Sequence, residues 1–320
     1  MNKILKYSLF IVSVLLLQSC VKDMQDDLND GGWSHDRMIL DIKLKNQVGK
    51  AEIERIDDVS GEIELSLNID AINDLSKVEL EKLQLSYDAK SSVSIGSILD
   101  FSNSDRTANI TITSATGQVR EYKVYAKEFR ETVTGTWSIN DLTVYGGTGA
   151  EYGGAAVLQL QSKSWCWYDD YAPKVEFDNI LTFTMDQITE EGNTSGICIN
   201  NAGADGKYAD FIFKGTMNAD NPGVDLDLKH FYRQIPEGES RWIRNYSLGT
   251  ISFTDKNGKV TSGVLENPGT YDLGNGKSIT IANNAFSFAL SGKDDWDHIY
   301  SDFDKFAKKA RKYYIMVTKQ

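Results

Sequence analysis

The chain has 320 residues, more than the ~250–300 at which a single hydrophobic core stops growing, so two domains are expected. Its 41% hydrophobic and 25% charged residues are typical of a folded protein rather than a disordered one. With 34 basic and 46 acidic side chains, the formal net charge of -12 excludes a general affinity for nucleic acids or anionic lipids. Three Cys and three His, scattered along the chain, argue against a structural zinc domain.

The first residues have the pattern of an export signal. An apolar run from Leu9 to Leu17 follows two lysines, is too short to span a bilayer, and ends near the small residue Ser19. Residues 1–19 are therefore expected to be a cleaved signal peptide. The tetrapeptide Leu17-Gln18-Ser19-Cys20 resembles the lipobox of bacterial lipoproteins, which implies that Cys20 becomes the first mature residue and is lipidated. An ordinary secretory signal with an incidental cysteine is the alternative.

Residues 20–34 are expected to form an acidic, solvated tether, because they contain few apolar side chains. Removal of Lys3 and Lys6 with the signal leaves 32 basic against 46 acidic side chains, a net charge of -14. The acidic pairs after Cys20 resemble the signal that sends Bacteroidetes lipoproteins to the outer face of the outer membrane. This resemblance implies a lipid-anchored, surface-exposed protein; the alternative is a tether that is acidic merely because it is solvated.

Residues 35–129 are predicted to form a small all-β domain. Apolar and polar residues alternate with period two in several short runs, which predicts strands with one solvated face: Leu40–Leu44, Ile63–Ile69, Leu83–Tyr87, Ile110–Ile112 and Tyr122–Ala126. The segment from Leu99 through Gly117 to Val124 resembles the immunoglobulin-like modules that follow the tether in Bacteroidetes surface lipoproteins. The resemblance implies a β-sandwich that acts as a spacer.

Residues 134–320 are predicted to form a larger antiparallel β-domain, with a helix that starts at Ser301 and places Phe303, Phe306 and Ala310 on one face, and a last strand at Tyr313–Thr318. Gly- and Asn-rich turns separate the other predicted strands. A jelly-roll-like β-sandwich is the favoured architecture. The start Gly135-Thr136-Trp137, together with a late helix and a last strand, also resembles lipocalin-like barrels, which are the alternative.

The richest aromatic run in this domain is Trp165-Cys166-Trp167-Tyr168-Asp169-Asp170-Tyr171. If residues 165–168 are a strand, Trp165 and Trp167 share one face. Exposed together, they would form an apolar platform that suits the C–H face of a sugar, with Asp169 and Asp170 positioned to bind hydroxyl groups. The alternative places both tryptophans in the core, where large aromatic side chains usually lie.

Three further residues are predicted to contact the same ligand. Glu176 follows the aromatic run, and Trp242 and Arg244 belong to a mixed basic and aromatic stretch around Pro236 that also includes Arg233, Arg241 and Tyr246. Arg and Trp combine stacking with hydrogen bonding, so this stretch is a candidate second wall of a sugar site. A plain exposed hairpin is the alternative.

No catalytic residue is predicted. Glu176-x-Asp178 resembles the start of the Glu-x-Asp-x-x-Glu signature of laminarinase-like β-glucanases, but Leu181 stands where the second Glu is required. A binding protein is therefore favoured over a glycoside hydrolase, which remains a minor alternative.

No cofactor or metal is predicted either. Oxygen-bearing side chains occur at Asp220, Asn221, Asp225 and Asp227 without the spacing of a calcium loop, and His230 is expected in a strand. Cys166 and Cys198 would share an oxidising compartment, and their spacing leaves both a disulfide and two buried thiols open.

The order of lipidated cysteine, acidic tether, spacer and Trp-rich distal domain resembles the surface glycan-binding lipoproteins of Bacteroidetes polysaccharide-utilisation systems. This resemblance implies capture of a polysaccharide or oligosaccharide for uptake through the outer membrane, with an outer-membrane transporter as a partner. A structural or adhesive lipoprotein, with its tryptophans buried, is the competing hypothesis.

Overall fold

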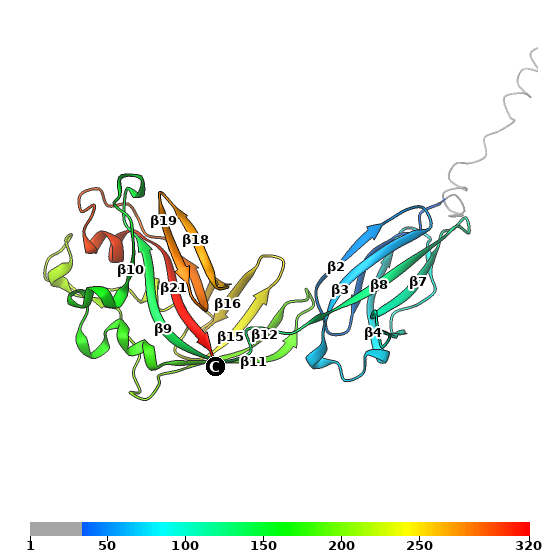
Figure 1. Ribbon diagram of the computed structural model, residues 1–320, viewed down its shortest axis with the longest axis horizontal. Coiled ribbons are helices and arrows are strands. Elements are labelled where there is room, and N and C mark those ends of the chain that lie inside the picture. The colour runs from blue at the N-terminus through cyan, green and yellow to red at the C-terminus, as the bar shows by residue number, and fades with distance from the viewer. Residues whose placement is uncertain (1–33) are drawn as a thin grey trace, which may run out of the picture. The chain divides into compact units, whose positions relative to one another are not determined.

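The computed structural model describes residues 34–320. The predicted signal peptide, the lipidation site at Cys20 and almost all of the predicted tether lie outside the described residues. The chain divides into two compact units between Arg130 and Glu131, inside the segment from Phe129 to Thr134 where the sequence changes character. Both units consist mainly of strands, which confirms the all-β class (Figure 1). In residues 34–320 no helix has the length and apolar character needed to cross a membrane.

The N-terminal unit contains two sheets. The larger has the order β2 (Gln47–Arg55), β3 (Ser60–Asn68), β8 (Val119–Phe129), β7 (Thr107–Thr113) and β5 (Lys90–Ser91), and the smaller has the order β1 (Ile39–Leu44), β4 (Val78–Leu85) and β6 (Ile98–Leu99). Strands β3 and β8 are parallel, and the other pairs are antiparallel. Two short 3₁₀ turns, η1 (Ile69–Ala71) and η2 (Leu75–Lys77), precede β4.

The period-two alternation of the sequence explains the core of this unit. On β3, Ile63, Leu65 and Leu67 are buried while the intervening residues are partly exposed. They pack in one apolar cluster with residues of the smaller sheet such as Ile42 and Leu80. Because side chains of both sheets share this core, the unit is the predicted β-sandwich.

The C-terminal unit is a closed antiparallel barrel of eight strands: β9 (Gly135–Gly146), β11 (Ile180–Ile188), β12 (Thr194–Asn201), β15 (Gly238–Asn245), β16 (Thr250–Thr254), β17 (Val260–Glu266), β20 (Asn284–Ala289) and β21 (Ala310–Lys319). Each strand pairs with the next barrel strand along the chain, and β21 pairs back onto β9. This sequential order is that of the lipocalin-like alternative. The predicted jelly roll is wrong, because it would need Greek-key crossovers and the strands instead pair in sequential order.

Three smaller pairings accompany the barrel. A short strand, β10 (Ala156–Gln159), pairs with the end of β9, and two hairpins are formed by β13 (Ile212–Phe213) with β14 (Leu226–Asp227) and by β18 (Gly269–Gly274) with β19 (Lys277–Ile281).

Large aromatic side chains fill the interior of the barrel. Phe183 stacks on Phe286 with ring centroids 5.6 Å apart, and Trp242 lies edge-on to Phe183 at 6.2 Å. The indole Nε1 of Trp242 donates a hydrogen bond to the carbonyl oxygen of Thr184 at 3.1 Å, which satisfies its one polar atom in the core. The barrel is therefore a packed core at these positions rather than an open cup.

The connections between barrel strands differ between the two ends of the barrel. The strand order and register place residues 147–179, 202–237 and 290–309 at one end, which we call the long-loop end. These segments include η3 (Ala150–Tyr152), η4 (Leu160–Cys166), η5 (Asp169–Tyr171), η6 (Pro173–Asp178), η7 (Gly215–Met217), α3 (Lys229–Tyr232) and the π-helical turn η8 (Asp304–Lys308). The opposite end carries the turns at 189–193 and 246–249 and the β18–β19 hairpin.

Local structure at the long-loop end corrects three predictions. The late helix is only the single turn η8; Phe303 and Phe306 are buried, but Ala310 begins β21. His230 lies in α3 and not in a strand. Residues 165–168 are not a strand either, because this segment crosses the end of the barrel, where no neighbouring strand is available for continuous pairing.

Candidate functional site

The predicted platform of two tryptophans is wrong. Trp165 lies in the last turn of η4 and is 51% exposed, whereas Trp167 is only 1% exposed. The ring of Trp167 packs edge-on to Phe213 and Phe306, each with centroids 5.8 Å away, and its Nε1 donates to the carbonyl oxygen of Leu160 at 3.0 Å. The two side chains diverge because a 3₁₀ turn does not have the two-residue period of a strand.

Two more of the predicted ligand-binding residues have structural roles. Trp242 is fully buried in the barrel core. Arg244 donates to a carboxylate oxygen of Glu131 at 2.7 Å and to the hydroxyl of Thr132 at 2.8 Å. Arg241, from the same stretch, forms a bidentate pair with Asp186 instead, so the basic and aromatic stretch does not form one wall.

Glu176 is buried and hydrogen-bonded within the protein. Its carboxylate is buried and accepts hydrogen bonds from the backbone N–H of Ala209 at 2.7 Å and from the guanidinium of Arg233 at 2.6 Å. The side-chain amide of Asn179 donates to its other oxygen at 2.9 Å. Asp178 accepts from the backbone N–H of Ala204 at 2.8 Å. Both carboxylates of the Glu-x-Asp sequence therefore organise loops at the long-loop end.

Asp169 and Asp170 are the predicted polar contacts that the structure leaves on the surface. Both lie in η5 and are exposed, next to the half-exposed Tyr168 and Tyr171. The ammonium of Lys207 donates to the backbone carbonyl of Asp170 at 3.4 Å. Of the proposed platform, Trp165, Asp169 and Asp170 thus remain accessible to a ligand.

The structure reveals a feature that the sequence analysis missed. Every described Trp, Tyr or Phe of the barrel unit that is strongly exposed belongs to the long-loop end, and we call this set the aromatic rim: Tyr152, Trp165, Tyr168, Tyr171, Trp296 and Tyr300. Figure 1 shows these loops beyond the ends of β9 and β10 and around η8. Exposed aromatic rings that gather at one end are unusual for a surface without a binding role.

Three rim residues each carry a lysine over one ring face. The ammonium groups of Lys163, Lys214 and Lys207 lie 5.0, 5.4 and 5.3 Å from the ring centroids of Trp165, Tyr168 and Tyr171, respectively. Such cation–π contacts attract the ammonium to the ring face, and the three aromatic side chains remain about half exposed.

Two carboxylates form hydrogen bonds with aromatic side chains of the rim. Asp302 accepts from the indole Nε1 of Trp165 at 3.3 Å, and Asp225 accepts from the hydroxyl of Tyr168 at 3.0 Å. The hydrogen bond and desolvation raise the pKa of the Tyr168 hydroxyl, so it stays protonated as a donor. Apolar ring faces, ammonium donors and carboxylate acceptors therefore occur side by side.

The remaining rim residues form a contacting group. Trp296 lies edge-on to Tyr152 with centroids 6.2 Å apart, and the hydroxyl of Tyr300 donates to the carbonyl oxygen of Tyr152 at 3.2 Å. Asp302 links this group to Trp165 because it lies two residues beyond Tyr300. In the sequence, Trp296 stands in the polar run Asp294-Asp295-Trp296-Asp297-His298, and that setting was the available signal of an exposed tryptophan.

A polar pocket of about 230 Å³ opens among residues of the same barrel end. It is lined by Arg233, Pro236, Glu237, Glu239, Asp255, Lys256, Lys259 and Thr261. Arg233 is held there by its buried pair with Glu176 and by a second pair with Glu237 at 3.4 Å.

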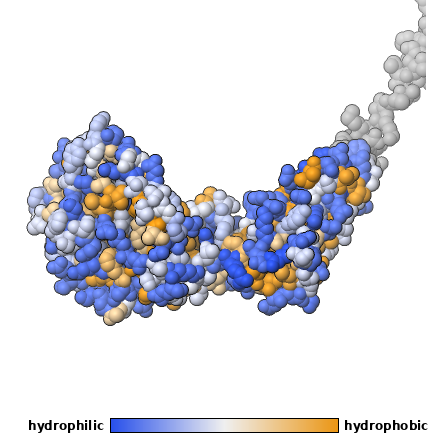
Figure 2. Space-filling model, viewed as in Figure 1, coloured by the Kyte–Doolittle hydropathy of each residue, from blue (hydrophilic) through white to orange (hydrophobic). Residues whose placement is uncertain are grey.

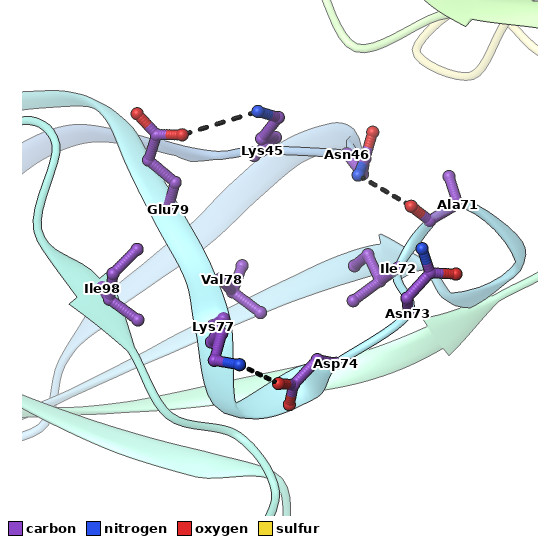
Figure 3. Close-up of a pocket in the computed structure, with 10 residues that line it drawn as sticks. All are labelled: Lys45, Asn46, Ala71, Ile72, Asn73, Asp74, Lys77, Val78, Glu79 and Ile98. Carbon is purple, nitrogen blue, oxygen red and sulfur yellow. Dashed lines mark hydrogen bonds and ion pairs between the residues drawn. The ribbon is translucent and has the colours of Figure 1, made fainter.

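One pocket of the N-terminal unit, of about 230 Å³, lies beside β4 (Figure 3). Its charged groups pair with one another: Lys77 with Asp74 at 2.9 Å and Lys45 with Glu79 at 3.5 Å. The face of the molecule in Figure 2 is mainly hydrophilic with small apolar patches. The paired charges of this pocket favour no particular ligand.

Cys166 and Cys198 are both buried free thiols, which settles the alternative that the sequence left open. Burial raises the pKa of each thiol to about 12, and the nearby carboxylate of Asp302 contributes for Cys166. The three carboxylates among the oxygen-bearing residues at 220–227 serve separate contacts: Asp225 also accepts from the backbone N–H of Gly215 at 2.7 Å, Asp227 accepts from that of Lys229 at 2.8 Å, and Asp220 pairs with Lys308.

No protein-family model matches the chain, and no curated protein matches it significantly.

Proposed function

We propose that the protein is a lipid-anchored, cell-surface carbohydrate-binding protein that captures a polysaccharide or oligosaccharide for uptake through the outer membrane. The observation that carries the proposal is the aromatic rim at one end of the barrel. The predicted site is thereby moved: Trp165, Asp169 and Asp170 stay in it, Trp296 and Tyr152 join it, and Trp167, Trp242, Glu176 and Arg244 leave it.

The chemistry of the rim suits a sugar. A pyranose presents flat C–H faces, which stack on aromatic rings, and hydroxyl groups at its edge, which need donors and acceptors. Trp165 offers a half-exposed ring beside the ammonium of Lys163 and the carboxylate of Asp302. Weak stacking at several rings suits a long glycan that is held by many copies of the protein on one membrane.

The lipid anchor and the surface location are supported by the sequence alone. The lipobox-like sequence ends at Cys20 and an acidic tether follows it. A Cys20→Ala variant is expected to lose incorporation of labelled fatty acid, and protease added to intact cells is expected to cleave the wild-type protein. Secretion of an unlipidated wild-type protein would contradict the anchor.

The binding experiment is a glycan-array and affinity-gel screen of the purified protein, followed by titration of any glycan that binds. The Trp165→Ala/Trp296→Ala double variant is expected to bind about 5- to 150-fold more weakly, because each of the two lost stacking contacts is worth about 0.5–1.5 kcal/mol. Tyr87→Ala, which removes an exposed aromatic side chain of the N-terminal unit, is the matched control and should bind like the wild type.

Equal binding by the double variant and the wild type would reject the rim as the site while leaving carbohydrate binding intact. Absence of binding to every glycan would favour the second candidate, a structural or adhesive surface lipoprotein. One observation supports that candidate: Trp167 and Trp242 are buried, as expected for a protein whose tryptophans serve the core.

A further inference from the structure

The turn that carries Trp296 also brings together three potential metal ligands. Asp220 belongs to the 202–237 connection, whereas Asp295 and His298 belong to the 290–309 connection. One ligand atom from each of these side chains lies within 4.8 Å of the other two. Residues so far apart along the chain meet here because both connections lie at the long-loop end. Within residues 34–320, these three side chains are the one group of three or more His, Cys, Asp or Glu residues close enough to hold a metal ion.

The distances match a metal polyhedron. His298 Nδ1 lies 2.9 Å from Asp295 Oδ2 and 3.6 Å from Asp220 Oδ1. Ligand atoms about 2.0–2.1 Å from a tetrahedral Zn²⁺ are separated from one another by about 3.3 Å. The two separations from His298 Nδ1 bracket that value, and the carboxylate oxygens of Asp220 and Asp295 lie within 4.8 Å of each other.

The donor set selects the kind of ion. Ca²⁺ and Mg²⁺ take oxygen ligands, whereas an imidazole nitrogen with two carboxylates suits zinc and similar first-row divalent ions. Three protein ligands leave the fourth position of a tetrahedral ion to water or to a bound ligand. Asp220 is exposed and Asp295 is buried, so the ion would lie at the surface with one side accessible.

The surrounding contacts fix the ligands in place. The backbone N–H of Asp295 donates to the hydroxyl of Thr148 at 2.7 Å, and that hydroxyl donates to the fully buried carboxylate of Asp304 at 2.7 Å. Lys308 pairs with the second carboxylate oxygen of Asp220 at 2.5 Å, which orients Oδ1 toward His298. Outer contacts of this kind orient metal ligands in known sites.

We propose that Asp220, Asp295 and His298 form a binding site for one zinc-class divalent cation at the long-loop end of the barrel. The site is independent of the proposed carbohydrate function, because its ligands are not the ring faces of the aromatic rim. It also differs from the oxygen-bearing group considered from the sequence: only Asp220 belongs to both.

The test is titration of the purified, metal-stripped protein with Zn²⁺ by isothermal calorimetry, with Ca²⁺ and Mg²⁺ in parallel. One equivalent of Zn²⁺ should bind, and the other two ions should bind far more weakly. His298→Ala and Asp220→Asn should each weaken Zn²⁺ binding at least about 100-fold, since loss of an outer contact alone costs about 10- to 100-fold. Co²⁺ should give the visible absorption of a four-coordinate nitrogen and oxygen site, and His298→Ala should abolish it.

Asp297→Asn is the matched control, because it removes one carboxylate charge from the same turn at an exposed position outside the cluster. It should bind Zn²⁺ like the wild type. Asp220 is exposed, so its variant is expected to fold even if His298→Ala does not. The proposal would be overturned by any of three results: unchanged Zn²⁺ binding in Asp220→Asn, equal weakening in Asp297→Asn, or no saturable binding by the wild type. The contact between His298 and Asp295 would then be an ordinary ion pair.

Discussion

The two ends of the barrel are built from the same strands but differ in what their connections do. At the long-loop end, long segments carry the aromatic rim and the Asp220, Asp295 and His298 cluster. At the opposite end, a buried carboxylate in the segment before β9 contacts β12 and β15: Glu131 binds Arg244 of β15 and accepts hydrogen bonds from Thr194 of β12 and from Tyr246. The long-loop end has buried charge pairs too, such as Glu176 with Arg233, but it also presents aromatic and charged groups to solvent.

This contrast separates binding from stability. Strand residues must satisfy the barrel core and the ladder of hydrogen bonds, so their freedom is small. The loops at the long-loop end form two layers. The inner layer consists of buried residues such as Trp167 and Phe306, which pack in the barrel core, and the outer layer consists of exposed residues that the core does not constrain. Substitutions in the inner layer should change stability, and those in the outer layer should change binding only.

Trp167→Ala should have the largest effect on stability. It removes an almost fully buried indole that packs on three aromatic rings, a change that costs about 3–5 kcal/mol of unfolding free energy. Trp165→Ala, two residues away and half exposed, should change the unfolding free energy by no more than about 0.5 kcal/mol. Urea denaturation of both variants measures the difference, and similar losses for the two would break the distinction between the layers.

Glu176→Ala should have the next largest effect and lower the unfolding free energy by about 3 kcal/mol, because it leaves the largely buried Arg233 without its main counter-charge. Glu237→Ala is the matched control: it removes the exposed partner of the same guanidinium and should cost no more than about 1 kcal/mol. The comparison also bears on the hydrolase alternative. If Glu176 were a catalytic acid in an accessible site, the loss of stability would be small and a reducing-sugar activity would disappear.

The sequence predicted the strands well wherever the relevant pattern is local. The alternation at Ile63, Leu65 and Leu67 is visible within nine residues of β3, and each of the three is buried. Closure of the barrel depends on the pairing of β21 with β9, for example Ile315 with Leu142, and no local pattern specifies a contact across such a separation. Sandwich and barrel therefore remained alternatives until the pairing was known.

The candidate site was less predictable, and two tryptophans show why. Alternation on β15 does place Trp242 on the same buried face as Ser240, so its burial was accessible from the strand pattern. For Trp165 and Trp167 the assumed strand period was wrong, because the segment forms 3₁₀ turns over the barrel end. The rim and the proposed metal site join segments more than 70 residues apart, which only the fold brings together.

Glu131→Gln should weaken the opposite end of the barrel by about 2 kcal/mol at neutral pH, because hydrogen bonds to charged groups contribute about 1.5–3 kcal/mol. Burial acts to raise the pKa of Glu131, but hydrogen bonds from Thr194, Tyr246 and the N–H of Val133, with the charge of Arg244, lower it overall. A lowered pKa stabilises the folded state above the ordinary Glu pKa of about 4.3, and the contribution is lost as the pH falls below it.

Unfolding free energies of wild type and Glu131→Gln at pH 7 and below pH 4 measure this dependence. The difference in unfolding free energy between the two proteins should become smaller as the pH is lowered. The Trp165→Ala/Trp296→Ala variant, altered only at the long-loop end, should follow the wild type at both pH values. A difference that is constant with pH would mean that the carboxylate charge of Glu131 does not hold this end together.

The smallest expected effect is that of a reducing agent. Cys166 and Cys198 are free and buried, so dithiothreitol should leave the unfolding midpoint unchanged. Because burial holds the pKa of both thiols near 12, almost no reactive thiolate exists at pH 8 in the folded state. Peptide-level mass spectrometry after iodoacetamide treatment should therefore find both residues unmodified in the folded protein and alkylated after unfolding. Selective labelling of Cys166 in the folded state would mean that the inner layer of the long-loop end opens, since Cys166 belongs to that layer whereas Cys198 lies on barrel strand β12.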